Sequence, residues 1–268
     1  MMAATKRPKP GFPVSMTTGL VLLCALLFNF STRAEDFSFT NYVAQAALAE
    51  ARRDISAALK IFAEAEARES GNVTNLCVLS RHYCDLMYLT NSASAKRDLL
   101  QRALHCAQQA VSAGPENATA HACLGVCCAQ SCAFANIKGE LDYSRRFKFE
   151  AEKTIAIDPK QDIAYYLLGR WHYGVANVGL LSRAYVKIVY SGLPKASNED
   201  AVKIFQKAIE LAPDRIIHHA GLAMVYAATG ERNRQIAELE KCRALKPADR
   251  EDEAARREAE KRLAALGK

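Results

Sequence analysis

The sequence lacks the short motifs through which many enzymes bind nucleotides or activate a nucleophile. None of its 13 glycines stands in a G-x-x-x-x-G-K-[ST], G-x-G-x-x-G or G-x-S-x-G pattern. It also has no uninterrupted apolar run of about 20 residues, the length that a membrane-spanning helix requires. These absences favour a binding protein over an enzyme, and we expect no catalytic residues and no cofactor.

Acidic residues are absent from the first 34 positions, and this distorts the overall charge. The formal net charge is +7, from 36 Lys and Arg against 29 Asp and Glu. Lys6, Arg7, Lys9 and Arg33 supply four of these seven charges, so the remainder of the chain carries only +3. A nearly balanced body gives no indication of nucleic-acid binding.

The same N-terminal segment resembles a secretory signal peptide. Basic residues precede the apolar run Leu20–Phe28, and Thr32-Arg33-Ala34 provides small residues where signal peptidase reads the chain. This run is shorter than the roughly 20 residues of a comfortable membrane span. We expect cleavage after Ala34 and export to a secreted or periplasmic location. The alternatives are a retained membrane anchor, or a segment that is buried or disordered.

Nine cysteines leave the redox compartment open, because removal of Cys24 with a signal peptide would leave an even number that permits disulfides without requiring them. Five lie at or beside helical positions that favour a small apolar side chain, and we interpret these as buried thiols in helix packing: Cys77, Cys123, Cys127, Cys128 and Cys242. The cluster from Cys123 to Cys132 has no second Cys/His pair with ligand spacing. We therefore expect no metal site.

A helical-hairpin repeat is the strongest pattern in the chain. Pro213 and Pro247 are 34 residues apart, which is the period of a tetratricopeptide repeat. Leucine followed by a small residue recurs upstream, and Leu124, Leu168 and Leu222 each lie nine residues after a proline. The sequence therefore predicts an all-α fold, a tetratricopeptide-like helical-hairpin solenoid.

The variable distance between repeats predicts elongated hairpins. From each of four such leucines, the next repeat-ending proline is 25 to 45 residues away, whereas the proline-to-leucine interval is constant. The extra length therefore falls inside the hairpins, where it does not disturb their stacking. The longest insertion, Val175–Asp200, is expected to contain an amphipathic helix that packs on the solenoid or meets a membrane or partner. Ser197 and Asp200 resemble a helix N-cap after it.

Small residues beside the repeated leucines have a packing role. Gly125, Gly169 and Ala223 fall in the first helices of three hairpins. They should let neighbouring helix backbones approach closely, while the adjacent leucines fill the space beside them. A bulky residue at position 169 should separate two helices.

We divide the chain into four parts. Residues 1–34 form the signal peptide or N-terminal membrane anchor, and residues 35–70 form entry helices that cap the array. Residues 71–247 contain the tetratricopeptide-like repeats. Residues 248–268 form a C-terminal capping helix, with a narrow apolar edge and a solvated, charged side.

The first helix of each hairpin is expected to line a concave surface. Positions on that face, counted from the repeated leucines, define the candidate groove: Arg81, Val126, Tyr166, Arg170, Tyr173 and Met224. The predicted groove is mostly small and apolar. It suits an amphipathic helix of a protein partner, or a lipid acyl chain whose anionic head meets Arg81 or Arg170. The alternative is that the chain's own insertions or terminal helix fill it.

Several stretches resemble the regulator of microtubule dynamics family. They are Glu152–Pro159, the Leu-Leu-Gly-Arg-Trp-His-Tyr run at 167–173, Ala201–Pro213 and Arg250–Glu253. The resemblance covers roughly residues 75–266 and implies a non-enzymatic, membrane-associated adaptor, with microtubule association and work at organelle contact sites as family themes. The cleavable-looking N-terminus departs from the family. Export would place cytoplasmic microtubules out of reach.

Two hypotheses follow, and neither is an enzyme. The first is a repeat scaffold that binds a protein partner or lipid through an apolar concave groove. The second is a membrane-associated adaptor, facing the cytoplasm, that is linked to microtubules or organelle contact sites. The near-neutral body weakens the second, because attraction to an acidic polymer favours clustered positive charge.

Overall fold

The computed structural model describes residues 39–68, 71–179, 183–184, 186–187 and 194–268. All regular structure in these ranges is helical. The predicted signal peptide or anchor and the middle of the 175–200 insertion lie outside the described residues. Among the helices of the described ranges, none is both long enough and apolar enough to cross a bilayer.

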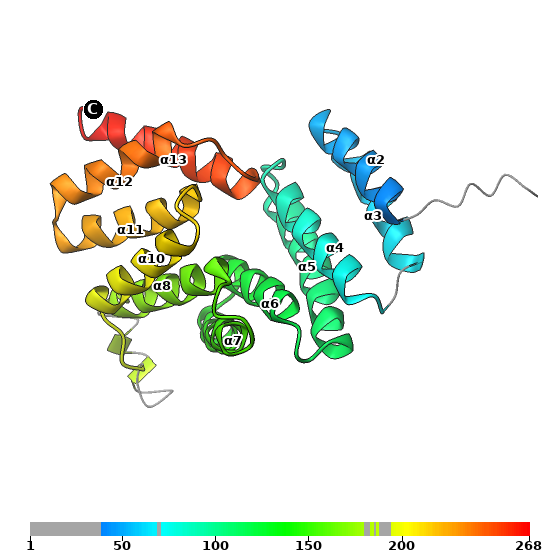
Figure 1. The fold of residues 1–268 in the computed structure, drawn as a ribbon, viewed down its shortest axis with the longest axis horizontal. Coiled ribbons are helices and arrows are strands. Elements are labelled where there is room, and N and C mark those ends of the chain that lie inside the picture. Colours follow the sequence, from blue (N-terminus) through cyan, green and yellow to red (C-terminus); the bar gives the residue numbers. More distant parts are fainter. Residues whose placement is uncertain (1–38, 69–70, 180–182, 185, 188–193) are drawn as a thin grey trace, which may run out of the picture.

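Within the described residues, five pairs of adjacent helices follow one another and a single helix ends the chain (Figure 1). The pairs are α2 (Phe39–Ala51) with α3 (Ile55–Arg68), α4 (Val73–Met87) with α5 (Ala93–Ala113), α6 (Ala118–Ser131) with α7 (Ile137–Ile157), α8 (Asp162–Ala176) with α10 (Asn198–Leu211), and α11 (Ile216–Thr229) with α12 (Arg232–Ala244). Helix α13 (Arg250–Ala265) packs on α11 and α12, and a short 3-10 helix, η1 (Cys132–Phe134), joins α6 to α7. This arrangement is the predicted all-α, tetratricopeptide-like solenoid, and its hairpins are elongated because α5 and α7 each have 21 residues.

The links between hairpins have a constant length, as the proline spacing predicted. Four residues separate the second helix of one hairpin from the first helix of the next in three links, namely 114–117, 158–161 and 212–215. Inside the hairpins the connections vary from two residues, between α11 and α12, to 21 residues, between α8 and α10. Ser197 Oγ accepts a hydrogen bond from the backbone N–H of Asp200 at 3.0 Å, which confirms the predicted N-cap of α10.

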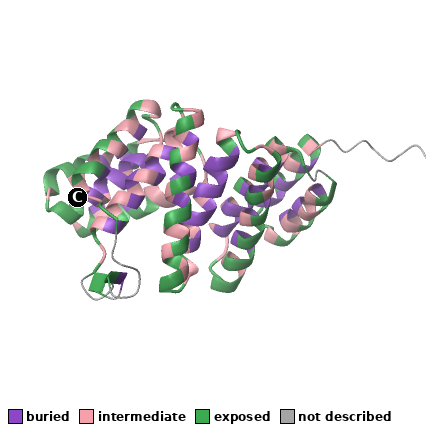
Figure 2. Ribbon diagram, turned by 90° about the horizontal axis from the view of Figure 1, so that it is seen from below, coloured by how far each residue is buried: buried purple, intermediate pink, exposed green. Residues whose placement is uncertain are grey.

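Neighbouring helices approach closely at the predicted small residues. A Cβ atom on Gly125 would lie 2.9 Å from Leu167 Cδ1, and one on Gly169 would lie 2.9 Å from the ring of Phe205. Both distances are too short for a real side chain, so these helices pack at the spacing that glycine permits. Buried residues gather between the helices, and exposed residues cover the outside of the array (Figure 2).

The array curves, and its C-terminal helix returns toward the first full hairpin (Figure 1). Asp249 and Glu251, at the start of α13, line the same cavity as Arg81, Asp85 and Tyr88 from α4 and its C-cap. Helix α13 therefore does more than end the array, because it also forms one wall of the concave side.

Candidate binding groove

Two adjoining cavities lie on the concave side. The first, of about 210 Å³, is lined by α4, α6, the N-terminal end of α8, Arg215 and the start of α13. The second, of about 250 Å³, lies between α8, α11 and α13, with α12 adding one residue. Tyr88 and Glu251 line both cavities, so the two lie next to each other, and we call them together the groove.

Five of the six predicted groove residues line these cavities. Arg81 and Val126 line the first. The second is lined by Tyr166, Arg170 and Met224. The guanidinium of Arg170 lies over the Tyr166 ring, 5.7 Å from its centroid. The sixth residue, Tyr173, lines neither cavity and instead packs, partly buried, against the core around Phe205. That these residues bind a partner remains a prediction.

The groove carries more charge than the mostly apolar surface expected from the first helices. Asp85 and Asp162 come from α4 and α8, Arg215 lies in a link between hairpins, and Asp249 and Glu251 lie at the start of α13. Three of these five lie outside the first helices, and the return of α13 brings its carboxylates to the cavity. In the sequence, the charged side of the C-terminal helix at residues 248–268 was the available signal, but we interpreted it as a solvated surface.

Helix α13 is attached to the groove by a buried carboxylate. Asp252 is fully buried, and its side chain accepts hydrogen bonds from the backbone N–H groups of Ile217 at 3.0 Å and Ala248 at 3.1 Å. Arg215 lies 3.3 Å from Asp252 through Nε and 2.8 Å from Asp249 through Nη2. These contacts hold the N-terminal ends of α11 and α13 together.

A histidine links two inner helices beneath the groove. His218 Nε2, in α11, lies 2.7 Å from Asp162 Oδ2, in α8, and the His218 ring is 5.5 Å from that of Tyr166. Burial opposes ionisation of Asp162, but the hydrogen bond and charge of His218 outweigh it, so the pKa of Asp162 lies below its usual value. This contact fixes the relative position of two groove walls.

Arg170 and Glu251 form the charged boundary between the two cavities. The nearby Tyr166 raises the pKa of Arg170 despite its burial, and Glu251 adds to the effect. Burial raises the pKa of Glu251, although Arg170 and Arg215 counteract this. A partner that displaces water from this point would meet a positive and a negative group side by side.

Histidines also tie together the two helices of single hairpins. His121 Nδ1, in α6, lies 2.5 Å from Glu150 Oε2, in α7, and its Nε2 lies 2.8 Å from the carbonyl oxygen of Pro115. The equivalent contacts in the last hairpin are His219 Nδ1 to Glu238 at 2.6 Å and Nε2 to the Pro213 carbonyl at 2.9 Å. These side chains have structural contacts on both ring nitrogens, so they are not candidates for proton transfer to a ligand.

Asp85 is the least compensated charge in the first cavity. Burial raises its pKa to about 7, and the negative charge of Asp249 adds to the effect. Within the described residues, Asp85 forms no ion pair. The ionised carboxylate therefore lowers the stability of the fold at neutral pH. Residues with a strongly shifted pKa are often found at binding sites.

We expect Asp85→Asn to stabilise the fold at pH 8 by about 2 kcal/mol. A pKa raised by about three units would correspond to about twice this free energy, and we halve it because water reaches the cavity and screens the charge. The raised pKa means that the folded state binds more protons than the unfolded state, so stability falls as the pH rises from about 4 to about 7. Denaturant unfolding at pH 8 and pH 4 should show a gain only at pH 8. Asp142→Asn, on an α7 side chain that is 59% exposed, is the matched control. An equal gain at both pH values would contradict this account.

The described residues contain no group of three or more His, Cys, Asp or Glu that could hold a metal ion. Cys128 of α6 is a buried packing group, and burial raises the pKa of its thiol to about 12. His218 and His219, which lack a companion motif in the sequence, are buried and paired with carboxylates. The groove is therefore suited to recognition through shape, charge and apolar contact.

The stacked hairpins and their concave groove define a tetratricopeptide-like helical scaffold. A thermophilic TPR protein of Thermus thermophilus has a similar fold, with a TM-score of 0.56 and 16% sequence identity over 83% of this chain and 98% of that one. The chain belongs to the regulator of microtubule dynamics family, because the family model described as "Regulator of microtubule dynamics protein 1-3" matches residues 42–267.

Curated relatives agree with this assignment. Regulator of microtubule dynamics protein 3 of Xenopus laevis is 32% identical over 135 residues, which is 50% of this chain and 29% of that protein. Protein 2 of Macaca fascicularis is 23% identical over 188 residues, covering 70% and 46%, respectively. Protein 1 of Mus musculus is 27% identical over 148 residues, covering 55% and 48%. The matched region thus spans less than half the length of each relative.

Proposed function

We propose that this chain is a non-enzymatic scaffold that binds a segment of a protein partner in the groove between α4, α6, α8, α11 and α13. The observation that supports this most directly is the pair of adjoining cavities on the concave side, lined by apolar and charged groups together. Tetratricopeptide-like arrays use such concave surfaces for binding.

The composition of the groove favours a partner helix with both apolar and basic side chains. Val126 and Met224 offer apolar contact in the two cavities. Asp85, Asp249 and Glu251 place negative charge at the first cavity, where a lysine or arginine of the partner would offset the cost of the Asp85 carboxylate. Helix-in-groove recognition combines these two kinds of contact.

The test is a groove variant with a matched outer control. Arg170→Glu with Met224→Asp changes the second cavity. Arg145→Glu with Ile137→Asp makes the same chemical changes on α7, where the Arg145 side chain is 62% exposed and Ile137 is 47% exposed. Both proteins are immobilised beside the wild type and exposed to an extract of the source cells, after circular dichroism has confirmed their helix content.

We expect the groove variant to lose at least about ten-fold of its principal bound protein, a change of about 1.4 kcal/mol. The outer variant should retain it. Equal capture by both variants would remove the groove from the account. Capture of vesicles in place of a protein, again sensitive to Arg170→Glu, would assign the groove to a lipid.

A second proposal, based on the family, is that the chain is a membrane-associated adaptor linked to microtubules or organelle contact sites. The relatives' names support the microtubule part of this proposal, and the membrane and contact-site parts come from the family resemblance alone. The test is co-sedimentation of the protein with microtubules at low and physiological salt, with and without residues 1–34. Binding that disappears when residues 1–34 are removed would come from the basic N-terminus and would contradict an adaptor role for the repeats.

Location decides between export and a cytoplasm-facing membrane. We propose export or membrane anchoring through residues 1–34, on the basis of the basic and apolar pattern of this segment. Intact mass and cell fractionation test it. A chain that begins at Glu35 in an exported fraction would support cleavage, and an intact chain in membranes would support an anchor.

A further inference from the structure

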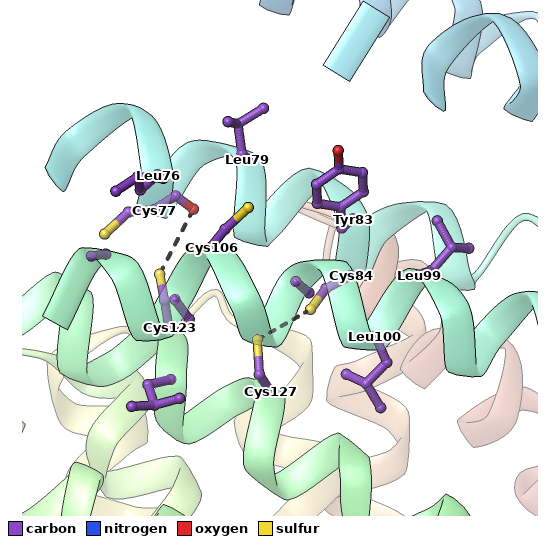
Figure 3. Close-up of a cluster of buried hydrophobic side chains, with 14 of the residues drawn as sticks. Leu76, Cys77, Leu79, Tyr83, Cys84, Leu99, Leu100, Cys106, Cys123 and Cys127 are labelled. Atoms are coloured by element: carbon purple, nitrogen blue, oxygen red, sulfur yellow. Dashed lines mark hydrogen bonds between the residues drawn. The ribbon is translucent and has the colours of Figure 1, made fainter. Parts of the chain in front are cut away.

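Four cysteines meet at the junction between the first two full hairpins, where α4 packs on α6 (Figure 3). Cys84 Sγ lies 3.9 Å from Cys127 Sγ. About one turn away along α6 and two turns away along α4, the thiol of Cys123 donates to the backbone carbonyl of Cys77 at 3.8 Å. All four are free thiols in the structure. Two cysteine contacts therefore connect helices of different repeats.

The closer pair can be reached by a small molecule from the groove. Cys84 lines the first cavity and is 7% exposed, whereas Cys127 is fully buried behind it. Cys84 is thus the sulfur that a small oxidant meets first. The Cys127 sulfur lies next to it, at 3.9 Å.

We propose that Cys84 and Cys127 are an oxidisable pair, which peroxide converts into a disulfide that joins α4 to α6. A disulfide has an S–S length of about 2.05 Å, so the two Sγ atoms must approach by about 2 Å. For the disulfide to form, this approach must come from rotation of the two thiols about their Cα–Cβ bonds. The bond would lock two repeats together and fix the width of the first cavity.

The pair can hold a thiolate in its buried setting. The hydrogen bond between Cys84 and Cys127 lowers the pKa of Cys127, and Ser80 Oγ, 3.3 Å from Cys127 Sγ, adds to the effect. The same hydrogen bond, together with burial, raises the pKa of Cys84 well above its usual value, so the proton of the pair stays on Cys84 and the thiolate forms on Cys127. By contrast, burial raises the pKa of nearby Cys106 to about 12, so that thiol stays protonated.

The reaction proceeds in two displacements. The Cys127 thiolate attacks one oxygen of a peroxide molecule that has entered past Cys84, the O–O bond breaks, and hydroxide leaves, which gives a sulfenic acid at Cys127. The Cys84 sulfur then attacks the Cys127 sulfur, the S–O bond breaks, and the second hydroxide leaves. The two thiol protons convert both hydroxides to water. Two thiols and one peroxide thus become one disulfide and two waters, and two electrons pass from sulfur to peroxide.

The test uses the full-length, reduced protein. It is treated with dilute hydrogen peroxide under native conditions, its remaining thiols are alkylated, and it is mapped without reduction by peptide mass spectrometry. We expect a Cys84–Cys127 linked peptide, a mass loss of two hydrogen atoms, and a higher midpoint of thermal unfolding that a reducing agent reverses. Cys84→Ser and Cys127→Ser should each abolish this peptide, whereas Cys106→Ser should retain it.

Two results would overturn the proposal. One is a wild-type protein that stays fully reduced under native conditions, or forms the linkage only in denaturant. The other is formation of sulfenic or sulfonic acid at Cys127 or Cys84 with no linked peptide. Because the linked peptide is read from the folded wild type, a variant that fails to fold does not affect the outcome.

Discussion

Replacing Phe205 with alanine is expected to lower the free energy of unfolding by about 3–5 kcal/mol, the usual cost of deleting a fully buried aromatic side chain. Phe205 is 0% exposed and comes from α10. Its ring lies between Gly169 of α8 and Gly221 of α11, so one side chain fills the contact among three helices. Loss of the ring leaves a cavity at the joint between two hairpins, and denaturant unfolding would measure the cost.

The reciprocal change tests the same contact from the other side. A Cβ atom on Gly221 would lie 2.3 Å from Phe205 Cε1, so Gly221→Ala should destabilise the fold by about 1–3 kcal/mol even though alanine favours a helix. Gly174→Ala is the control. Gly174 lies in α8, as Gly169 does, but no atom lies within 4 Å of the position that its Cβ would occupy. In a Phe205→Leu background the cost of Gly221→Ala should fall, since the smaller side chain leaves room. Equal costs in both backgrounds would show that the ring is not what Gly221 accommodates.

The repeat pattern was visible in the sequence because it depends on local rules. A proline cannot continue a helix, so each one marks the link between hairpins, and the constant nine-residue interval to a leucine sets the register of the next helix. Gly169 could be identified because it follows such a leucine. Gly221 precedes its leucine, and its closer contact depends on the direction in which Phe205 points, which no local pattern gives.

The charged groove could not be derived in the same way. Its walls come from residues far apart in the chain, such as Asp85 and Glu251, which share a cavity only because the array curves. The curvature is the sum of small rotations between hairpins, set by packing rather than by any motif. A helix was correctly expected within residues 248–268, but its charged side was expected to face solvent only. The pattern of charges on one helix does not show which of its carboxylates contacts the end of a different helix.

The contacts of His121 and His219 could have been predicted by comparing equivalent positions of the repeats. The residue six positions after each of three repeat prolines is His121, Tyr165 and His219. All three reach back to the proline carbonyl, Tyr165 through its hydroxyl at 3.1 Å. The polar character of this position was visible, but its partner was not, because the carbonyl lies within the link between hairpins.

Removal of the Asp252 carboxylate is expected to release α13 from the groove. Asp252→Ala would leave Arg215 with a weakened ion pair and the Ile217 N–H without its acceptor, and loss of one partner of a buried ion pair costs about 3–5 kcal/mol. Asp252→Asn keeps the side-chain volume, but its amide NH₂ would face the backbone N–H of either Ile217 or Ala248, and two donors cannot bond to each other. We therefore expect a smaller loss of stability than for Asp252→Ala.

The control for Asp252→Ala is Glu253→Ala, because its partly exposed side chain pairs only with Arg250 and should contribute less than about 1 kcal/mol. Denaturant unfolding gives the free energies, and hydrogen exchange at the Ile217 amide reports whether the junction opens locally or with the whole fold. Since α13 lines both cavities, local opening in Asp252→Ala should also abolish partner binding while α4 to α8 stay folded. If Asp252→Ala and Glu253→Ala unfold alike, the carboxylate does not hold α13, and the wall of the groove must rest on the apolar contacts of Ala259 and Leu263 with α11 and α12.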